Sequence, residues 1–234
     1  MLSTSNDIAS NLARVRDEIA SVCARCGRKP EEVTLVGVSK TRSAAEVVEA
    51  VRAGLQQVGE NRVQEAAPKL EQVRKELGGA AFSAHMVGHL QTNKVKAALG
   101  TFDWIDSVDS LHLAQAIGTR RHGMPDMPVL LEVYVGDDPE RPGIRPDALV
   151  ETTGQILAVP GIRVAGLMTV APLGGDPRQD FLTVREWKVR LSKKFPRVHF
   201  GVLSMGMSED FAIAIEEGST QVRIGTALFG PRRP

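Results

Sequence analysis

The chain has 234 residues, of which 42% are hydrophobic and 24% charged, and its formal net charge is +1. This length suits one α/β barrel or two small domains, and the near-neutral charge gives no electrostatic basis for binding nucleic acid or a membrane surface. No apolar run approaches the roughly 20 residues of a membrane span, and the polar N-terminus is unlike a signal peptide, so we expect a cytoplasmic protein.

The N-terminal segment is predicted to form a helix. Gly27 and Pro30 mark its end, because glycine favours helix termination and proline interrupts helical hydrogen bonding. Apolar residues recur along one face at steps of four and three, namely Ile8, Leu12, Val15, Ile19 and Val22.

Two cysteines, Cys23 and Cys26, form a CxxC pair at the end of this helix. Such a pair occurs in redox sites and in half of a zinc site. However, residues three apart on a helix are neighbours in any case, and no second CxxC or HxxxH follows. We therefore expect two reduced helix cysteines and no metal site.

Strand and helix patterns then alternate to the end of the chain. Short runs rich in β-branched residues predict buried strands, and longer amphipathic runs between them predict helices. Ser43 and Glu46 form a capping box at the start of one such helix. The eight strand candidates are residues 33–40, 56–60, 82–88, 103–108, 129–135, 163–170, 198–204 and 221–225.

This alternation predicts an α/β fold with a parallel sheet, and eight repeats favour a closed (β/α)8 TIM barrel over an open sheet. Nothing after residue 230 is long enough for an eighth following helix, so we expect the N-terminal helix to cover that gap in the outer ring. No linker or shift in composition marks a second domain, and residues 1–234 are interpreted as one.

Residues with reactive or polar side chains gather where the predicted strands end. The active face of such a barrel is formed by the carboxyl ends of its strands. Lys40 ends the first strand, and a partly desolvated lysine there loses its proton readily and becomes a Schiff-base nucleophile. Taken alone, Lys40 is more typical of a solvated lysine at a strand end.

The last two loops change this interpretation. Ser204, Gly206 and Ser208 lie at the end of the seventh strand, and Gly225 and Thr226 at the end of the eighth. Loops at these places form a recurring phosphate site of the fold, with glycine backbone N–H groups and hydroxyls as donors. As an alternative, Ser208 is only a helix N-cap. A lysine and a phosphate site at one barrel mouth together indicate a phosphorylated aldehyde.

Long segments of the chain resemble the YggS/PROSC family of pyridoxal 5′-phosphate (PLP) binding homeostasis proteins. The resemblance spans nearly everything after residue 30. The matching segments are VGVSKTRSAAEVVEAVRAG (36–54), VGENRVQEAAPKL (58–70), HMVGHLQTNKVK (85–96), GLMTVAP (166–172) and SMGMSEDFAIAIEEGSTQVRIGTALFG (204–230).

The resemblance implies a monomeric fold-type III barrel, similar to the barrel half of alanine racemase, with PLP held as an imine on Lys40. It implies a role in PLP storage, buffering or delivery to PLP-requiring apo-enzymes, without robust catalysis and without a catalytic residue. Arg223 is expected beside the pyridine nitrogen, and Asn61, otherwise a helix N-cap, near the cofactor. The implied phosphate contacts are Ser204, Ser208, Gly225 and Thr226, with backbone help from Met205 and Gly206.

Two enzymatic alternatives remain. A fold-type III racemase resembles this barrel but needs a second, β-rich domain and a tyrosine from it, whereas the only tyrosine here is Tyr134, where the family usually has asparagine. The segment 135–144 also departs from the family, with Arg141 in place of lysine. A lysine-dependent aldolase acting on a sugar phosphate needs an acid or base beside Lys40, and no matching signature is present.

Overall fold

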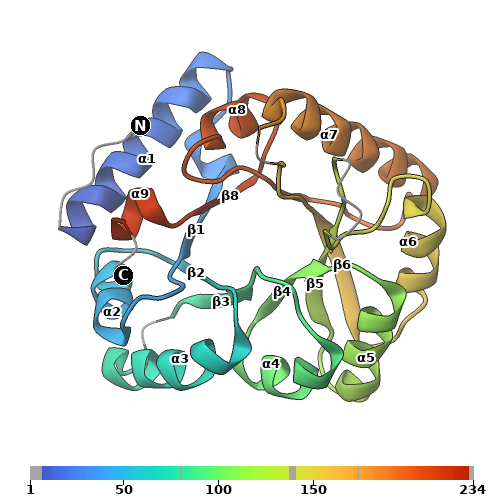
Figure 1. Cartoon of the computed structure of the whole chain (residues 1–234), viewed down its shortest axis with the longest axis horizontal. Helices are drawn as coiled ribbons and strands as arrows, with labels where there is room; N and C mark the ends of the chain where they lie inside the picture. The colour runs from blue at the N-terminus through green and yellow to red at the C-terminus, as the bar shows by residue number, and fades with distance from the viewer. Residues whose placement is uncertain (1–6, 80, 137–140, 173, 232–234) are drawn as a thin grey trace.

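The computed structural model describes residues 7–79, 81–136, 141–172 and 174–231. Its eight strands pair in parallel with their neighbours in sequence and close into a barrel, β8 pairing back to β1 (Figure 1). The predicted fold class is therefore confirmed. The strands are β1 (Thr34–Val38), β2 (Gln57–Glu60), β3 (Ser83–Met86), β4 (Trp104–Val108), β5 (Met127–Glu132), β6 (Ile162–Met168), β7 (Val202–Ser204) and β8 (Gln221–Ile224).

Helices surround this barrel as an outer ring. The ring contains α1 (Ile8–Arg25), α2 (Ala44–Arg52), α3 (Val63–Leu77), α4 (Val95–Thr101), α5 (Leu111–Arg121), α6 (Leu149–Leu157), α7 (Pro177–Lys194), α8 (Phe211–Glu216) and α9 (Thr226–Phe229), with 3-10 turns η1 (Pro30–Glu32) and η2 (Thr92–Lys94). Because α9 is only four residues long, it leaves a gap after β8. As predicted, α1 fills that gap, packing between α8, α9 and α2 (Figure 1).

Local signals explain where several helices begin. At α2, the Ser43 hydroxyl accepts a hydrogen bond from the Glu46 N–H, and the Glu46 carboxylate accepts one from the Ser43 N–H, so the predicted capping box is present. At α1, the Asp7 carboxylate accepts from the Ala9 N–H at 3.0 Å. These contacts satisfy N–H groups that no helical carbonyl can reach.

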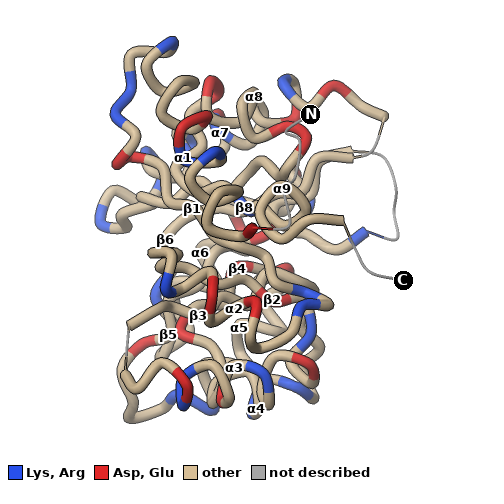
Figure 2. The backbone as a smooth tube through the Cα atoms, turned by 90° about the vertical axis from the view of Figure 1, so that its left-hand side faces the viewer, with Lys and Arg blue, Asp and Glu red and all other residues tan. Residues whose placement is uncertain are grey.

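The core has two parts, one inside the barrel and one between the barrel and its helices. Most of the buried residues in the second part are valine, leucine or isoleucine. At the β6–β7 contact, a Cβ added to Gly166 would lie 1.8 Å from the Val202 carbonyl oxygen, so only glycine permits this approach. Lysine, arginine and acidic residues are interspersed along the outer elements, without a stripe of one sign (Figure 2).

Each of the eight strands is shorter than the sequence predicted, and β1 ends at Val38, so Lys40 follows the strand rather than ending it. Strand β5 ends at Glu132 rather than at Val135, because the chain then turns away to bridge Val133 with Ile144. Helix α8 begins at Phe211, after Asp210, so Ser208 is not its N-cap, and Arg62 rather than Asn61 precedes α3. Residues 137–140 of the segment 135–144 lie outside the described residues. Within the described residues, no helix is both long enough and apolar enough to cross a membrane.

Candidate functional site

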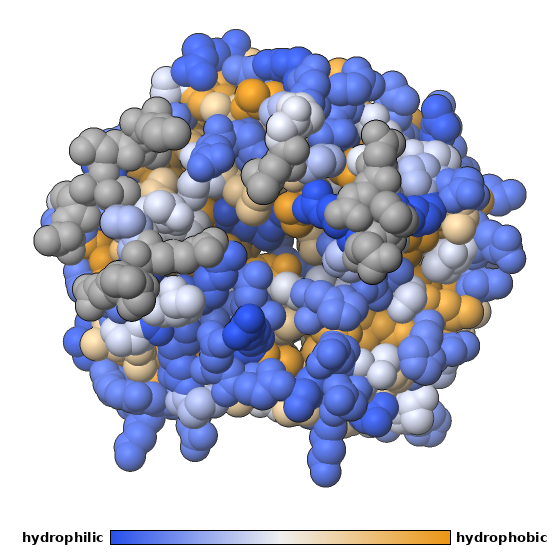
Figure 3. Space-filling view, in the orientation of Figure 1, coloured by the Kyte–Doolittle hydropathy of each residue, from blue (hydrophilic) through white to orange (hydrophobic). Residues whose placement is uncertain are grey.

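A cavity of about 600 Å³ opens at the carboxyl ends of the strands. The face seen in Figure 3 is hollowed near its centre, inside the ring of helices. Six residues predicted from the sequence line this cavity together, drawn from β8 and from the segments that follow β1, β2, β7 and β8: Lys40, Asn61, Ser208, Arg223, Gly225 and Thr226. Apolar walls come from Val38, Val87, Val170 and Ile213.

Lys40 lies in a tight turn directly after β1. The turn runs from Ser39 to Arg42 and is closed by a hydrogen bond from the Arg42 N–H to the Ser39 carbonyl, 3.0 Å long. The Lys40 side chain is half-buried and lines the cavity. The apolar strand before it explains this position, since β1 carries the lysine out of the barrel interior to its rim.

Arg223 extends from the last strand into the same cavity and is only 4% exposed. Its guanidinium donates to the Ser204 carbonyl and hydroxyl, both at 2.8 Å, and to the Thr169 carbonyl at 2.7 Å. Burial lowers the pKa of Arg223, whereas the negative charges of Asp106, Glu132 and Asp210 act in the opposite direction. The result is a fixed cation whose orientation is set by the ends of β6 and β7.

Ser204 lies behind this arginine and outside the cavity lining. Its side chain is fully buried, and its hydroxyl accepts from both Arg223 and Gln221. Gln221 also donates to Asp106 at 2.7 Å, and Asp106 is 3.0 Å from the His85 Nδ1. A polar chain therefore crosses the barrel beneath the cavity, and in the structure Ser204 contacts Arg223 where the sequence had suggested a phosphate contact.

The loop after β7 forms one wall of the cavity. Met205 is buried and Gly206 has a φ of +95°, and neither lines the cavity, whereas Ser208 does. A Cβ on Gly206 would lie 2.6 Å from that of Ala214, so this glycine lets the loop close against α8. The Ser208 hydroxyl lies 3.4 Å from the Ala227 N–H, which joins the β7 and β8 loops.

Asp210 also lines this wall and shapes the same loop. Its carboxylate accepts from the Met207 N–H at 2.6 Å. Burial is the main cause that raises the pKa of Asp210, and the hydrogen bond from Met207 lowers it. The sequence analysis did not single out Asp210 as a residue of the site.

Asn61 directly follows β2 and lines the cavity. No side-chain hydrogen bond caps α3, so a capping role for Asn61 is excluded. The β3 loop packs directly on its backbone, since a Cβ on Gly88 would lie 2.4 Å from the Asn61 carbonyl oxygen. This contact holds the Asn61 backbone in place beside the cavity.

The far side of the barrel mouth is acidic. Glu132, at the end of β5, is 8% exposed, and burial together with the charge of Asp109 raises its pKa to about 7. Asp109 in turn accepts from Ser110 and pairs with His89 at 3.0 Å. Sequence analysis missed Glu132, although a single carboxylate within the apolar run VLLEV was a signal that could have revealed it.

Tyr134 is buried next to this acidic side and does not line the cavity. The Arg145 guanidinium lies 3.5 Å above its ring, and its hydroxyl has no hydrogen-bond partner among the residues that the structure describes. Cys23 is buried and Cys26 exposed, with no disulfide between them, and the described residues contain no cluster of three potential metal ligands.

The amino-acid sequence is similar to proteins of known family. Residues 10–233 match the family model described as alanine racemase, N-terminal domain. The pyridoxal phosphate homeostasis protein of Escherichia coli K12 is 40% identical over 231 residues, covering 97% of each chain. The protein of the same name from Aquifex aeolicus is 41% identical over 228 residues, covering 95% of this chain and 97% of the other.

Solved structures of similar fold include both a PLP-bound protein and an alanine racemase. PipY of Synechococcus elongatus PCC7942 with PLP bound has a TM-score of 0.84 at 35% identity, covering 95% of this chain and 100% of PipY. Alanine racemase from Corynebacterium glutamicum has a TM-score of 0.63 at 18% identity, and the match covers 92% of this chain and 61% of the enzyme. This second likeness concerns the fold alone.

Proposed function

The chain belongs to the pyridoxal phosphate homeostasis proteins, a family with the alanine racemase N-terminal barrel, and from this membership we propose that it binds PLP at the barrel mouth for storage, buffering or delivery. One observation carries the proposal: an amine, a buried guanidinium and two hydroxyls line a single cavity, on Lys40, Arg223, Ser208 and Thr226.

The chemistry of these donors fits the cofactor. A phosphate ester and an unprotonated pyridine nitrogen only accept hydrogen bonds, while amine, guanidinium, amide and hydroxyl groups donate them. We assign covalent attachment to Lys40, the phosphate to Ser208, Gly225 and Thr226, and the ring nitrogen to Arg223. Asn61 contributes a further donor beside the cavity. The buried hydroxyl of Ser204 supports this site by orienting Arg223.

Arg223 also favours holding PLP over transforming an amino acid. When bound, PLP supplies an aldehyde that condenses with amines and a ring that withdraws electrons. The guanidinium remains protonated and can only donate, so a ring nitrogen that accepts from it stays uncharged and withdraws electrons weakly. Arg223 itself is fixed by three acceptor atoms on Ser204 and Thr169, which leaves it little freedom to reorient.

We propose a monomeric cytoplasmic carrier, one PLP-binding domain over residues 1–234, that passes its cofactor to PLP-requiring apo-enzymes. Tyr134 offers no support for racemisation, because its ring packs under Arg145 and does not line the cavity. The E. coli and A. aeolicus relatives, by their names, serve pyridoxal phosphate homeostasis, and PipY was solved with PLP bound.

The decisive experiment locates the cofactor. The purified chain is incubated with PLP, reduced with borohydride, digested and analysed by mass spectrometry, and the expected result is one pyridoxyl group on Lys40. An adduct on another lysine, or none, would reject the assignment.

A second experiment separates the carrier from the racemase. Loaded protein is mixed with a PLP-requiring apo-enzyme, whose regained activity reports transfer, and in parallel with free amino acids, whose optical rotation reports racemisation. The carrier function predicts transfer without sustained turnover. Rapid racemisation would instead establish the enzyme, and protein treated with borohydride beforehand, which cannot release its cofactor, is the matched control.

A further inference from the structure

The turn that carries Lys40 has an unusual backbone. Lys40 is its second residue and Thr41 its third, and Thr41 has a φ of +66°, the single positive value among the described residues other than glycine. A positive φ at the third position is what a type II turn requires, and glycine or asparagine is preferred there. Threonine is β-branched, so this conformation is strained and needs support from its surroundings.

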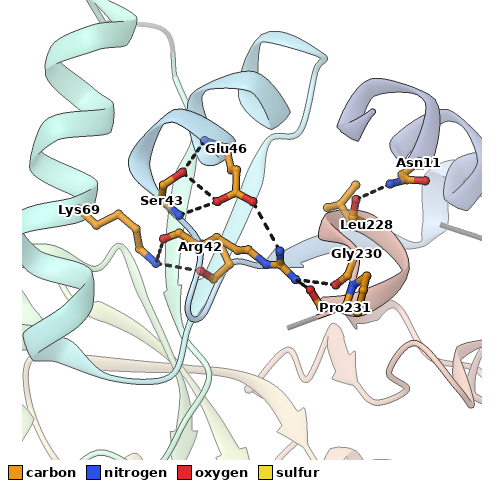
Figure 4. A network of polar contacts seen from close by, with 9 residues as sticks. Asn11, Arg42, Ser43, Glu46, Lys69, Leu228, Gly230 and Pro231 are labelled. Atoms are coloured by element: carbon orange, nitrogen blue, oxygen red, sulfur yellow. Dashed lines mark hydrogen bonds and ion pairs between the residues drawn. The ribbon is translucent and has the colours of Figure 1, made fainter. Parts of the chain in front are cut away.

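One support comes from α3 and β2. The Lys69 ammonium donates to the Ser39 carbonyl at 2.8 Å and to the Arg42 carbonyl at 3.2 Å, so it joins both ends of the turn (Figure 4). It also pairs with Glu60 at 2.6 Å, a carboxylate that is fully buried and accepts from the Ser39 hydroxyl as well. The turn is therefore held from below by a buried ion pair.

The other support comes from the end of the chain. The Arg42 guanidinium donates to the carbonyls of Gly230 and Pro231 at 2.5 and 2.7 Å, and it lies 3.5 Å from Glu46 (Figure 4). Glu46 belongs to the capping box that begins α2. Arg42 therefore holds the turn between the first residues of α2 and the residues that follow α9.

Helix α9 extends this support to the cavity. Thr226, which lines the cavity, is its first residue, and Gly230 directly follows its last. The Asn11 side chain donates to the Leu228 carbonyl at 3.1 Å and so fixes α9 to α1 (Figure 4). Arg42 thus connects the lysine turn to the same short helix that begins at the proposed phosphate site.

We propose that Arg42 and Lys69 are positioning residues that hold the strained Ser39–Arg42 turn in its positive-φ form and so direct the Lys40 amine into the cavity. This inference rests on the proposed function, because it explains how this chain keeps its cofactor-binding lysine in place. It adds a role for Arg42, whose guanidinium joins two parts of the chain 188 residues apart in sequence.

Arg42→Met is the informative variant, because removing Lys69 would leave Glu60 buried without its cation. Without the guanidinium, Thr41 is free to relax to a negative φ, which moves Lys40. If the competent turn falls to about a tenth of the population, the apparent affinity for PLP falls about tenfold. Arg42→Lys keeps a cationic hydrogen-bond donor, so we expect it to lose less PLP affinity than Arg42→Met.

Thr41→Gly provides the critical control. Glycine adopts a positive φ without strain and no longer needs the support. Alone, it should leave PLP affinity within about twofold of the original, and combined with Arg42→Met it should restore most of the lost affinity, a coupling that a double-mutant cycle measures. If Arg42 only stabilised the fold, glycine at residue 41 would not restore the PLP affinity lost in Arg42→Met. If Arg42→Met does not fold, Arg42→Lys with and without Thr41→Gly supplies the same cycle.

A readout on the apo-chain separates this inference from the proposed function. Reductive methylation with formaldehyde and cyanoborohydride is followed at Lys40 by mass spectrometry, with the exposed Lys194 as internal standard. The rate of methylation at Lys40 should change in Arg42→Met. It should return to the value of the original chain in the double variant, whether or not PLP binds. Unchanged methylation in Arg42→Met, or no recovery with glycine, would overturn the inference, while absence of any PLP adduct in the original chain would overturn only the proposed function.

Discussion

The two sides of the barrel mouth differ in the charged and polar groups that they present. On the side of β1, β7 and β8, hydrogen-bond donors line the cavity together with the Asp210 carboxylate, and Arg223 is fixed by Ser204 and Thr169. On the side of β4 and β5, Asp109 and Glu132 lie close enough for the charge of one to raise the pKa of the other. The first side suits a phosphate ester, and the second repels one.

The strands beneath the two sides differ as well. Pairing of β1 with β2 and with β8 runs in continuous register. The register shifts between β4 and β5 and again between β5 and β6. Above these irregular strands lies the Tyr134 hydroxyl, buried without a partner among the described residues. The comparison teaches that regular strands and fixed hydrogen-bond donors lie on one side, while register shifts, two close carboxylates and the buried Tyr134 hydroxyl lie on the other.

The largest expected effect tests the donor side. Lys40→Ala removes the amine, so we expect complete loss of the borohydride-stable adduct at this position, while the midpoint of thermal unfolding shifts by less than about 4 °C because the side chain is half-buried at a rim. Mass spectrometry and circular dichroism measure the two results. An unchanged total yield of adduct would mean that another residue binds the cofactor. The donor side would then not be the binding side.

The next effect tests the acidic side through its pH dependence. Because the folded-state pKa of Glu132 is raised from 4.5 to about 7, its contribution to stability is fully present below pH 4.5 and is lost as the pH rises through 7. We therefore expect Glu132→Gln to stabilise the apo-chain by about 3 kcal/mol at pH 8.5 and by almost nothing at pH 4.

Urea unfolding at a series of pH values measures this difference. Glu151→Gln, on the surface of α6, is the control and should show no comparable trend. If Glu132→Gln changed the free energy of unfolding equally at both ends of the pH range, the pKa of Glu132 would not be raised by folding.

A smaller effect tests the proposed phosphate contacts. Ser208→Ala and Thr226→Ala each remove one hydroxyl that lines the cavity, and each should weaken PLP binding by about 1–3 kcal/mol, as expected for a hydrogen bond to a charged group. Equilibrium titration followed by the absorbance of bound PLP measures the loss. Thr119→Ala, on the outer face of α5, serves as the control, and unchanged affinity in both cavity variants would contradict the phosphate assignment.

The smallest effect sharpens the comparison at Tyr134. Tyr134→Phe removes a buried hydroxyl without a partner in the described structure and keeps the ring under Arg145. We expect the apo-chain to gain up to about 1 kcal/mol in unfolding free energy, with PLP affinity unchanged. A loss of stability would mean that the hydroxyl is hydrogen-bonded, and a loss of affinity would extend the binding site to the acidic side.

Much of this protein was determined by patterns local in sequence. The alternation of short β-branched runs with amphipathic runs predicted the eight parallel strands, and the Ser43–Glu46 spacing predicted the start of α2, because these signals depend on neighbours within a few residues. The position of Lys40 followed as well, since a residue at the carboxyl end of a barrel strand must lie at the rim.

Only the tertiary structure decided which groups meet across the barrel. Ser204 contacts Arg223 through a pairing of β7 and β8 that no spacing reveals, and the raised pKa of Glu132 depends on burial and on Asp109 from the segment after β4. Likewise, the strained φ of Thr41 is supported by Lys69 on one side and, through Arg42, by Gly230 on the other. Hydrogen bonds and charges act through space, so their partners are known only once distant segments have packed together.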